Sequence, residues 1–250
     1  MTVTLPVTGK FYEAEKSKTG IILFHAYTGS PNDFNLLARK LQNLGLEVYC
    51  PLFEGHGTQD IFDILDAHPD DWWIQAQEVL SFMQARDYDH IGIFGLSLGG
   101  IFATRLLSEN HDPQLFGGVF NSPVITFGPI DVSYFFNLYA KDLYRRQDQI
   151  DHYQQVHSQM MDGYKNQIQE IYYFTTAFHM NLQDITNPFF IAQSGKDEMI
   201  DPQSAYLLQE ALIHAPVSFH WFEDNSHVIT INRDRAAFEQ ALIEFISAQA

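Results

Sequence analysis

Short apolar runs alternate with segments of helical periodicity along most of the chain. The runs have the length of buried strands and are bounded by polar or small residues. Between them, apolar residues recur at three- and four-residue spacing, which is typical of amphipathic helices. This pattern predicts strands at residues 21–25, 46–50, 90–94, 117–121, 188–193 and 217–222, and helices at residues 31–44, 70–86, 98–107, 202–213 and 233–246.

Strands that alternate with helices predict an α/β fold with a mostly parallel sheet and helices on both faces. Residues 52–67 are expected to form a loop between two such units. The alternation fails over residues 123–185, which are rich in aromatic and amide side chains and are interpreted as a helical insertion. The predicted core therefore consists of residues 1–122 and 186–250. Ligands of such sheets bind beyond the carboxyl ends of the strands.

Composition narrows the classes of partner. The net charge is −17 over 250 residues, so the surface should repel phosphate backbones and anionic lipid head groups. Nucleic-acid binding and electrostatic docking to membranes are therefore not expected. Membrane insertion is not expected either, because no apolar run approaches the roughly 18 residues that span a bilayer. The single cysteine, Cys50, excludes a disulfide framework and a multi-cysteine metal site. Residues 1–20 do not resemble a signal peptide, and a cytoplasmic protein is expected. The sequence leaves the oligomeric state open.

The strongest chemical signal is the segment Gly95-Leu96-Ser97-Leu98-Gly99-Gly100. It follows a predicted strand and opens a predicted helix, which is the context of a nucleophile elbow. Glycine suits both flanks of so tight a turn, and the turn raises Ser97 to the sheet edge. The Leu98 N–H, in the first turn of the helix, is free to point at a developing oxyanion.

A serine nucleophile needs a histidine base, and the base needs an acid to orient it, in the chain order Ser, Asp or Glu, His. His227 follows the last predicted strand in a loop, whereas His220 lies inside that strand and His214 at a helix end. We therefore expect His227 to be the base. Asp197 follows the strand at 188–193 and is the expected acid.

Several other side chains are candidates for these roles or for the oxyanion site. Asp201 precedes Pro202 and is better explained as a helix N-cap. The loop after the first central strand should supply the second oxyanion donor, for which the Tyr27 amide is the candidate. Glu198 and Asp224 remain weaker candidates for the acid, and His25 and His56 are expected to support their loops rather than to react.

Together these segments resemble the small bacterial carboxylesterases of the α/β-hydrolase superfamily, in the branch related to monoacylglycerol lipases. The resemblance runs nearly end to end. It departs from the family at Ala26, where glycine is usual, which bears on the rate and the acyl preference. It is carried by residues 25–29, by Pro51 to Gly57, by Asp70-Asp71-Trp72-Trp73, by the serine elbow, by Asp197-Glu198-Met199-Ile200 and by Ser226-His227-Val228-Ile229-Thr230.

The resemblance implies an α/β-hydrolase fold with a helical cap at residues 123–185. It implies a triad of Ser97, Asp197 and His227, and hydrolysis of small-molecule carboxyl esters with no metal or cofactor. The aromatic insertion favours an apolar acyl group. A thioesterase or a monoacylglycerol lipase would use the same triad, and a non-catalytic binding protein is a further alternative. Epoxide hydrolases and haloalkane dehalogenases place aspartate at the elbow, so Ser97 argues against them.

Overall fold

The computed structural model describes residues 3–232 and 234–249. Its strands are β1 (Gly9–Tyr12), β2 (Thr19–Phe24), β3 (Glu47–Pro51), β4 (His90–Leu96), β5 (Leu115–Phe120), β6 (Phe189–Ser194) and β7 (Val217–Phe222). Its α-helices are α1 (Asn35–Asn43), α2 (Ile61–Asp66), α3 (Pro69–Gln84), α4 (Leu98–Glu109), α5 (Ser133–Arg146), α6 (Ile150–Thr176), α7 (Ser204–Ala211) and α8 (Arg235–Ser247).

The strands form one sheet in the order β1-β3-β2-β4-β5-β6-β7. All neighbouring pairs are parallel except β1 with β3. Strands β2, β3, β5 and β6 are buried along their whole length, and β4 is buried except at its first residue, His90, as expected for strands covered on both faces. The predicted mostly parallel sheet with helices on both faces is confirmed.

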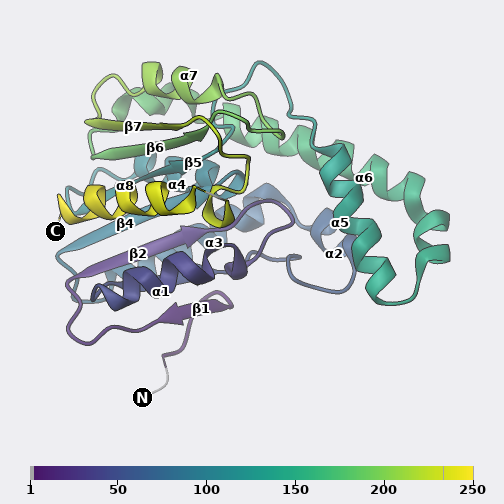
Figure 1. The fold of residues 1–250 in the computed structure, drawn as a ribbon, viewed down its shortest axis with the longest axis horizontal. Coiled ribbons are helices and arrows are strands. Elements are labelled where there is room, and N and C mark those ends of the chain that lie inside the picture. Colours follow the sequence, from purple (N-terminus) through teal and green to yellow (C-terminus); the bar gives the residue numbers. More distant parts are fainter. Residues whose placement is uncertain (1–2, 233, 250) are drawn as a thin grey trace.

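Two hydrophobic cores lie on opposite faces of this sheet. Helices α1 and α8 cover one face, in front of the sheet in Figure 1, where their apolar residues pack on Leu23, Phe94 and Phe120. Helices α3, α4 and α7 cover the other face and pack on residues such as Ile22 and Ile93. Successive strand residues thus serve alternate cores, because side chains of a strand point to opposite faces in turn.

Three local features differ from the sequence prediction. The edge strand β1 was not predicted, because a four-residue strand carries little periodicity. Residues 52–67 are not all loop: α2 begins after Asp60, whose side chain accepts a hydrogen bond from the Phe62 N–H at 2.9 Å. Helix α7 begins at Ser204, and Asp201 instead closes a turn ahead of it by accepting from the Gln203 N–H at 3.0 Å.

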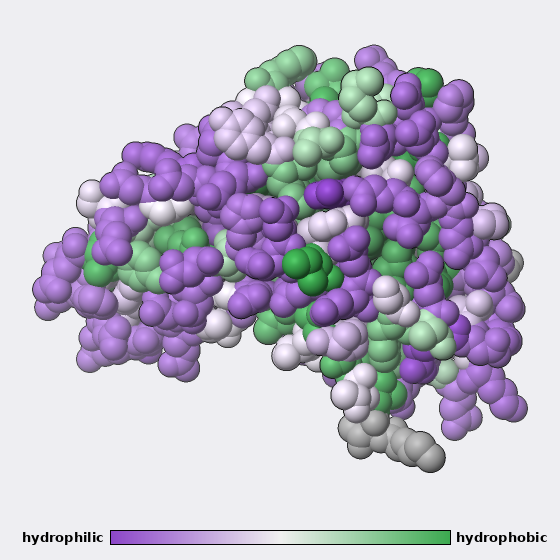
Figure 2. All heavy atoms as spheres, turned by 180° about the vertical axis from the view of Figure 1, so that it is seen from behind, coloured by the Kyte–Doolittle hydropathy of each residue, from purple (hydrophilic) through white to green (hydrophobic). Residues whose placement is uncertain are grey.

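Residues 123–185 contain two consecutive helices, α5 and α6, that do not belong to the layers covering the two faces of the sheet. These helices pack against each other and lie together at one end of the sheet, on the right in Figure 1. The reverse side of the molecule is mostly hydrophilic, with apolar residues in small groups (Figure 2). Within the described ranges, no helix is long and apolar enough to cross a membrane.

Candidate active site

Ser97 occupies the sharp turn between β4 and α4. Its φ of 52° lies in the left-handed region, which is strained for a residue with a side chain. A Cβ on Gly95 would lie 2.1 Å from the backbone of Gly99, and a Cβ on Gly99 would lie 2.0 Å from the carbonyl oxygen of Phe24. The elbow therefore requires glycine at both positions, and it holds Ser97 at the N-terminus of α4.

His227 and Asp197 meet in loops beyond the carboxyl ends of β7 and β6. The Nδ1 of His227 lies 2.9 Å from Oδ1 and 2.8 Å from Oδ2 of Asp197. Both side chains are buried, with 2% and 0% of their surface exposed. Because a carboxylate oxygen only accepts, Nδ1 must carry the proton and Nε2 must present its lone pair. No group in the described ranges hydrogen-bonds to this Nε2.

The Asp197 carboxylate is itself held in place. Its Oδ1 accepts hydrogen bonds from the backbone N–H groups of Met199 at 2.9 Å and Ile200 at 3.0 Å. These donors orient the carboxylate toward the imidazole. The other acids considered for this role lie elsewhere: Asp224 accepts from the Lys196 ammonium at 2.6 Å, and Asp201 holds the turn ahead of α7.

The backbone of His227 is fixed by Glu198, which the sequence left as a weaker candidate for the acid, and by Asn121, which the sequence did not indicate. The Glu198 carboxylate accepts from the His227 N–H at 2.9 Å, and the Asn121 amide donates to the His227 carbonyl oxygen at 2.5 Å. Asn121 is fully buried at the end of β5 and also accepts from the Ser194 N–H at 2.7 Å. The sequence offers no signal for Asn121, one amide among many.

The residues of the proposed oxyanion donors, Leu98 and Tyr27, line the same cavity as Ser97. Leu98 is the first residue of α4, so its N–H lacks a partner within the helix. Tyr27 lies in a four-residue turn closed by the Gly29 N–H, which donates to the Ala26 carbonyl at 2.8 Å. The closing hydrogen bond of such a turn leaves the N–H of its second residue unused. The Tyr27 amide is thus available to a ligand.

The Asp33 carboxylate holds the turn at Ala26–Gly29 through hydrogen bonds to the backbone. It accepts from the Ala26 N–H at 3.2 Å and from the Ser30 N–H at 3.3 Å. Burial raises the pKa of Asp33 to about 6, although these two donors act in the opposite direction. A Cβ on Gly29 would lie 2.2 Å from the same carboxylate, so the turn is packed closely on Asp33.

The two early histidines brace the loops around the turn. His25 Nδ1 lies 2.8 Å from the Ala26 carbonyl oxygen, and His25 Nε2 accepts from the Phe53 N–H at 3.1 Å. Burial lowers the pKa of His25 to about 4, so its ring is neutral near pH 7. His56 packs on it with ring centroids 4.6 Å apart, and burial also lowers the pKa of His56. Neither ring lines the cavity that contains Ser97 and His227.

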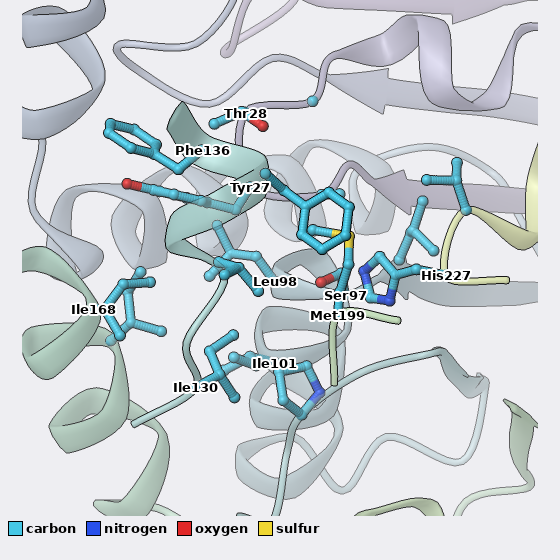
Figure 3. Close-up of a pocket in the computed structure, with 18 of the residues that line it drawn as sticks. Tyr27, Thr28, Ser97, Leu98, Ile101, Ile130, Phe136, Ile168, Met199 and His227 are labelled. Carbon is cyan, nitrogen blue, oxygen red and sulfur yellow. The ribbon is translucent and has the colours of Figure 1, made fainter. Parts of the chain in front are cut away.

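Ser97 and His227 line one cavity of about 180 Å³ at the carboxyl end of the sheet. Figure 3 shows their side chains next to each other, with Tyr27 and Leu98 alongside. The remainder of the wall is mainly apolar, and α6 contributes Ile168 to it. The other lining residues come from several parts of the chain and are apolar apart from Thr28 and Asp33: Ala26, Thr28, Gly29, Asp33, Leu96, Ile101, Pro123, Ile130, Val132, Phe135, Phe136, Ile171, Met199 and Val228.

The aromatic residues of α5 contribute unequally to the cavity. Phe136 is buried and lines it. Tyr134 is 66% exposed, and neither Tyr134 nor Tyr139 is part of the lining. Of these three aromatic residues only Phe136 therefore faces the cavity, because a helix turns only one side toward the sheet. Across the described ranges, no three His, Cys, Asp or Glu side chains are grouped so as to hold a metal ion.

Comparison with known proteins places this geometry in context. A family model described as "Serine aminopeptidase, S33" matches residues 15–234. The chain is 25% identical over 244 residues to the carboxylesterase of Bacillus subtilis (strain 168), covering 96% of this chain and 97% of that protein. It is also 25% identical over 248 residues to the thermostable monoacylglycerol lipase of Bacillus sp. (strain H-257), covering 96% and 94%.

The fold has close counterparts among solved structures. A metagenome-derived lipolytic enzyme superposes with a TM-score of 0.72 at 18% identity, covering 98% of this chain and 100% of that one. The predicted α/β-hydrolase fold is confirmed by this likeness together with the strand order.

Proposed function

The chain belongs to the family of hydrolases described as serine aminopeptidase, S33, and we propose that it is a serine carboxylesterase acting through Ser97, His227 and Asp197. The observation that carries this proposal is the shared cavity. A strained serine and the free Nε2 of an acid-oriented histidine line the same mainly apolar space. These are the nucleophile and base that acyl transfer requires.

The reaction begins with acylation of the serine. His227 Nε2 takes the proton of the Ser97 hydroxyl as the oxygen attacks the ester carbonyl carbon, and the carbonyl oxygen becomes an oxyanion. The Tyr27 and Leu98 N–H groups donate to that oxyanion. Asp197 stabilises the imidazolium that forms. His227 then protonates the leaving alcohol as the ester C–O bond breaks, which leaves an acyl group on Ser97.

Deacylation repeats these steps with water. His227 removes a proton from the water as its oxygen attacks the acyl carbon, and the same two amides stabilise the second oxyanion. The bond to Ser97 breaks, and His227 returns the proton to the serine oxygen as the carboxylic acid leaves. Apart from this water, neither half-reaction as written uses a group outside the chain and the ester.

The mainly apolar cavity supports an apolar acyl group. The wall beyond Ser97 includes Ile130, Phe136 and Ile168, and its cap helices offer no charged side chain to that space. We propose that residues 123–185 act as a cap whose buried side sets acyl preference, while the core residues 1–122 and 186–250 perform the chemistry.

Initial rates on p-nitrophenyl esters of increasing acyl length, measured beside acyl thioesters, test the substrate class. A carboxylesterase should turn over the esters faster and show an optimum length. The Ser97→Ala variant is the control for background hydrolysis. Faster turnover of thioesters would instead favour a thioesterase with the same triad.

A monoacylglycerol lipase is the second candidate. The relative from Bacillus sp. (strain H-257) bears this name and covers nearly the whole chain. A monoacylglycerol lipase activity would differ from the leading proposal only in the leaving alcohol, which would be glycerol. Release of fatty acid from a monoacylglycerol at a kcat/KM above that for simple alkyl esters of equal acyl length would favour it. A cytoplasmic location stays a prediction, to be tested by locating the esterase activity in cell fractions.

A further inference from the structure

The side chain of Tyr27 links the proposed oxyanion turn to the cap. Its hydroxyl donates a hydrogen bond to Oε1 of Gln167 on α6 at 2.5 Å, across 140 residues of sequence. Burial raises the pKa of Tyr27 well above its ordinary value, with nearby Tyr164 adding to the effect, so the hydroxyl keeps its proton. The residue that offers a backbone N–H to the oxyanion is thus held at its far end by the cap.

The orientation of the Gln167 amide is determined by its other partners. Its Nε2 donates to the carbonyl oxygens of Ile64 and Ala67, the latter at 2.8 Å. Carbonyl oxygens only accept, so the NH₂ group must face them and Oε1 must face Tyr27. Gln167 is 1% exposed, and its side chain joins α6 to the end of α2 and to the turn. A buried amide with every strong partner satisfied is a rigid anchor.

The Tyr27 turn is held from two opposite sides. On the core side, Asp33 accepts from the Ala26 N–H. On the cap side, Gln167 accepts from the Tyr27 hydroxyl, and the Tyr27 ring stacks on Phe136 with centroids 5.9 Å apart. Thr28, the next residue, has a φ of 58°, a strained value for a residue with a side chain. A turn containing strain needs such outside contacts to keep its shape.

We propose that Gln167 is a positioning residue for the oxyanion site, which it aligns through the Tyr27 hydroxyl. The inference rests on the proposed function, since it requires the Tyr27 amide to stabilise an oxyanion. It assigns the cap a part in the chemical step in addition to its part in acyl preference. A hydrogen bond to an oxyanion strengthens only in the transition state, so misalignment should lower kcat and leave KM nearly unchanged.

Tyr27→Phe tests the proposal with the smallest change, because it removes the hydroxyl and keeps the stacked ring. We expect kcat on a p-nitrophenyl ester to fall about tenfold, less than the roughly 10²–10³ that loss of a whole oxyanion donor costs. Tyr164→Phe is the matched control. Tyr164 is also buried, stacks on Phe136 and accepts from the Val132 N–H at 2.8 Å, but it makes its hydrogen bond within the cap segment. Its kcat should stay within about twofold of wild type.

Gln167→Met tests whether Gln167 is the residue through which the Tyr27 hydroxyl acts. The double variant Tyr27→Phe/Gln167→Met should lose no more kcat than the worse single variant, because both changes break the same hydrogen bond. Independent multiplication of the two losses would overturn the proposal. So would a Tyr27→Phe enzyme with the kcat of wild type and only a lower denaturation midpoint, since the contact would then be structural; the ester hydrolysis of wild type would still stand. A wild-type chain that hydrolyses no ester or thioester would overturn both proposals.

Discussion

The Nδ1 atom of His227 lies within 2.9 Å of both carboxylate oxygens of Asp197, although the two residues are 30 positions apart in the chain. Two parallel strands bring them together, because β6 and β7 are neighbours and their carboxyl ends meet at one edge of the sheet. The same edge carries Ser97, at the end of β4. The proposed chemistry therefore follows from the topology of the sheet.

Replacing the acid should reduce activity without unfolding the chain. Asp197→Asn keeps the size of the side chain but offers an NH₂ group to His227, so the imidazole is left in the wrong tautomer. We expect kcat to fall roughly 10³- to 10⁴-fold. Asp201→Asn is the matched control and should be mild, because asparagine closes a turn of this kind about as well as aspartate. The reverse ranking in steady-state kinetics would move the acid to Asp201.

Ser97 and His227 should behave as one unit. Each single alanine variant should lose about 10⁴-fold or more in kcat, and the double variant should be hardly worse, because either loss removes the nucleophilic route. His56→Ala provides a comparison: its ring braces the loop near His25 and should cost far less. If the two histidine variants lost equal activity, the base would have to be reassigned.

The cap should set acyl preference through its buried side alone. Phe136→Ala enlarges the cavity and should move the preferred p-nitrophenyl ester toward longer acyl chains. Tyr134 lies two positions before Phe136 on α5 and is 66% exposed, so Tyr134→Ala should leave the chain-length profile unchanged. Identical chain-length profiles for wild type and Phe136→Ala, with a lower denaturation midpoint only, would show that this part of the insertion serves packing.

The contribution of buried His25 to stability should fall as the pH drops below about 6.5. Burial lowers the pKa of His25 from 6.5 to about 4, so between these values the unfolded chain binds a proton that the folded chain does not. His25 alone should lower the free energy of unfolding by up to roughly 3 kcal/mol across that window, at about 1.4 kcal/mol per pH unit. The raised pKa of Asp33 acts in the opposite direction below about pH 6, so the difference between wild type and a His25 variant isolates the His25 contribution. Urea midpoints at about pH 7 and about pH 5 measure it.

A His25→Asn variant is the control for this pH dependence. It should be less stable than wild type at about pH 7, because it loses part of the bracing, yet it should lose less on acidification. Some dependence should persist, since burial also lowers the pKa of His56. An unchanged slope in the variant would mean that His25 does not carry the effect.

The strand and helix alternation was readable from the sequence because the parallel strands are buried on both faces and form continuous apolar runs. Edge strand β1 and the short helix α2 were not, since each spans too few residues to show a period. Asp60 followed by Ile61, Ile64 and Leu65 at helical spacing was the signal that could have found α2.

In the candidate site too, some residues could be predicted from the sequence and others could not. Ser97, Asp197 and His227 stand out because the elbow, the strand ends and the chain order restrict their positions. Asn121 and Gln167 do not, because their hydrogen bonds join segments far apart in the chain, and an amide in a helix or at a strand end has many other uses. Such supporting contacts become visible only when the fold is known.

The most direct measurement of the central proposal is covalent labelling with a fluorophosphonate, read by intact mass and by peptide mapping. The reagent reports a serine activated by a neighbouring base, independently of which ester is the natural substrate. We expect one adduct per chain, located on Ser97, and we expect no adduct on the Ser97→Ala variant and very slow labelling of His227→Ala. An unlabelled wild-type chain, or an adduct on any other serine, would contradict the account.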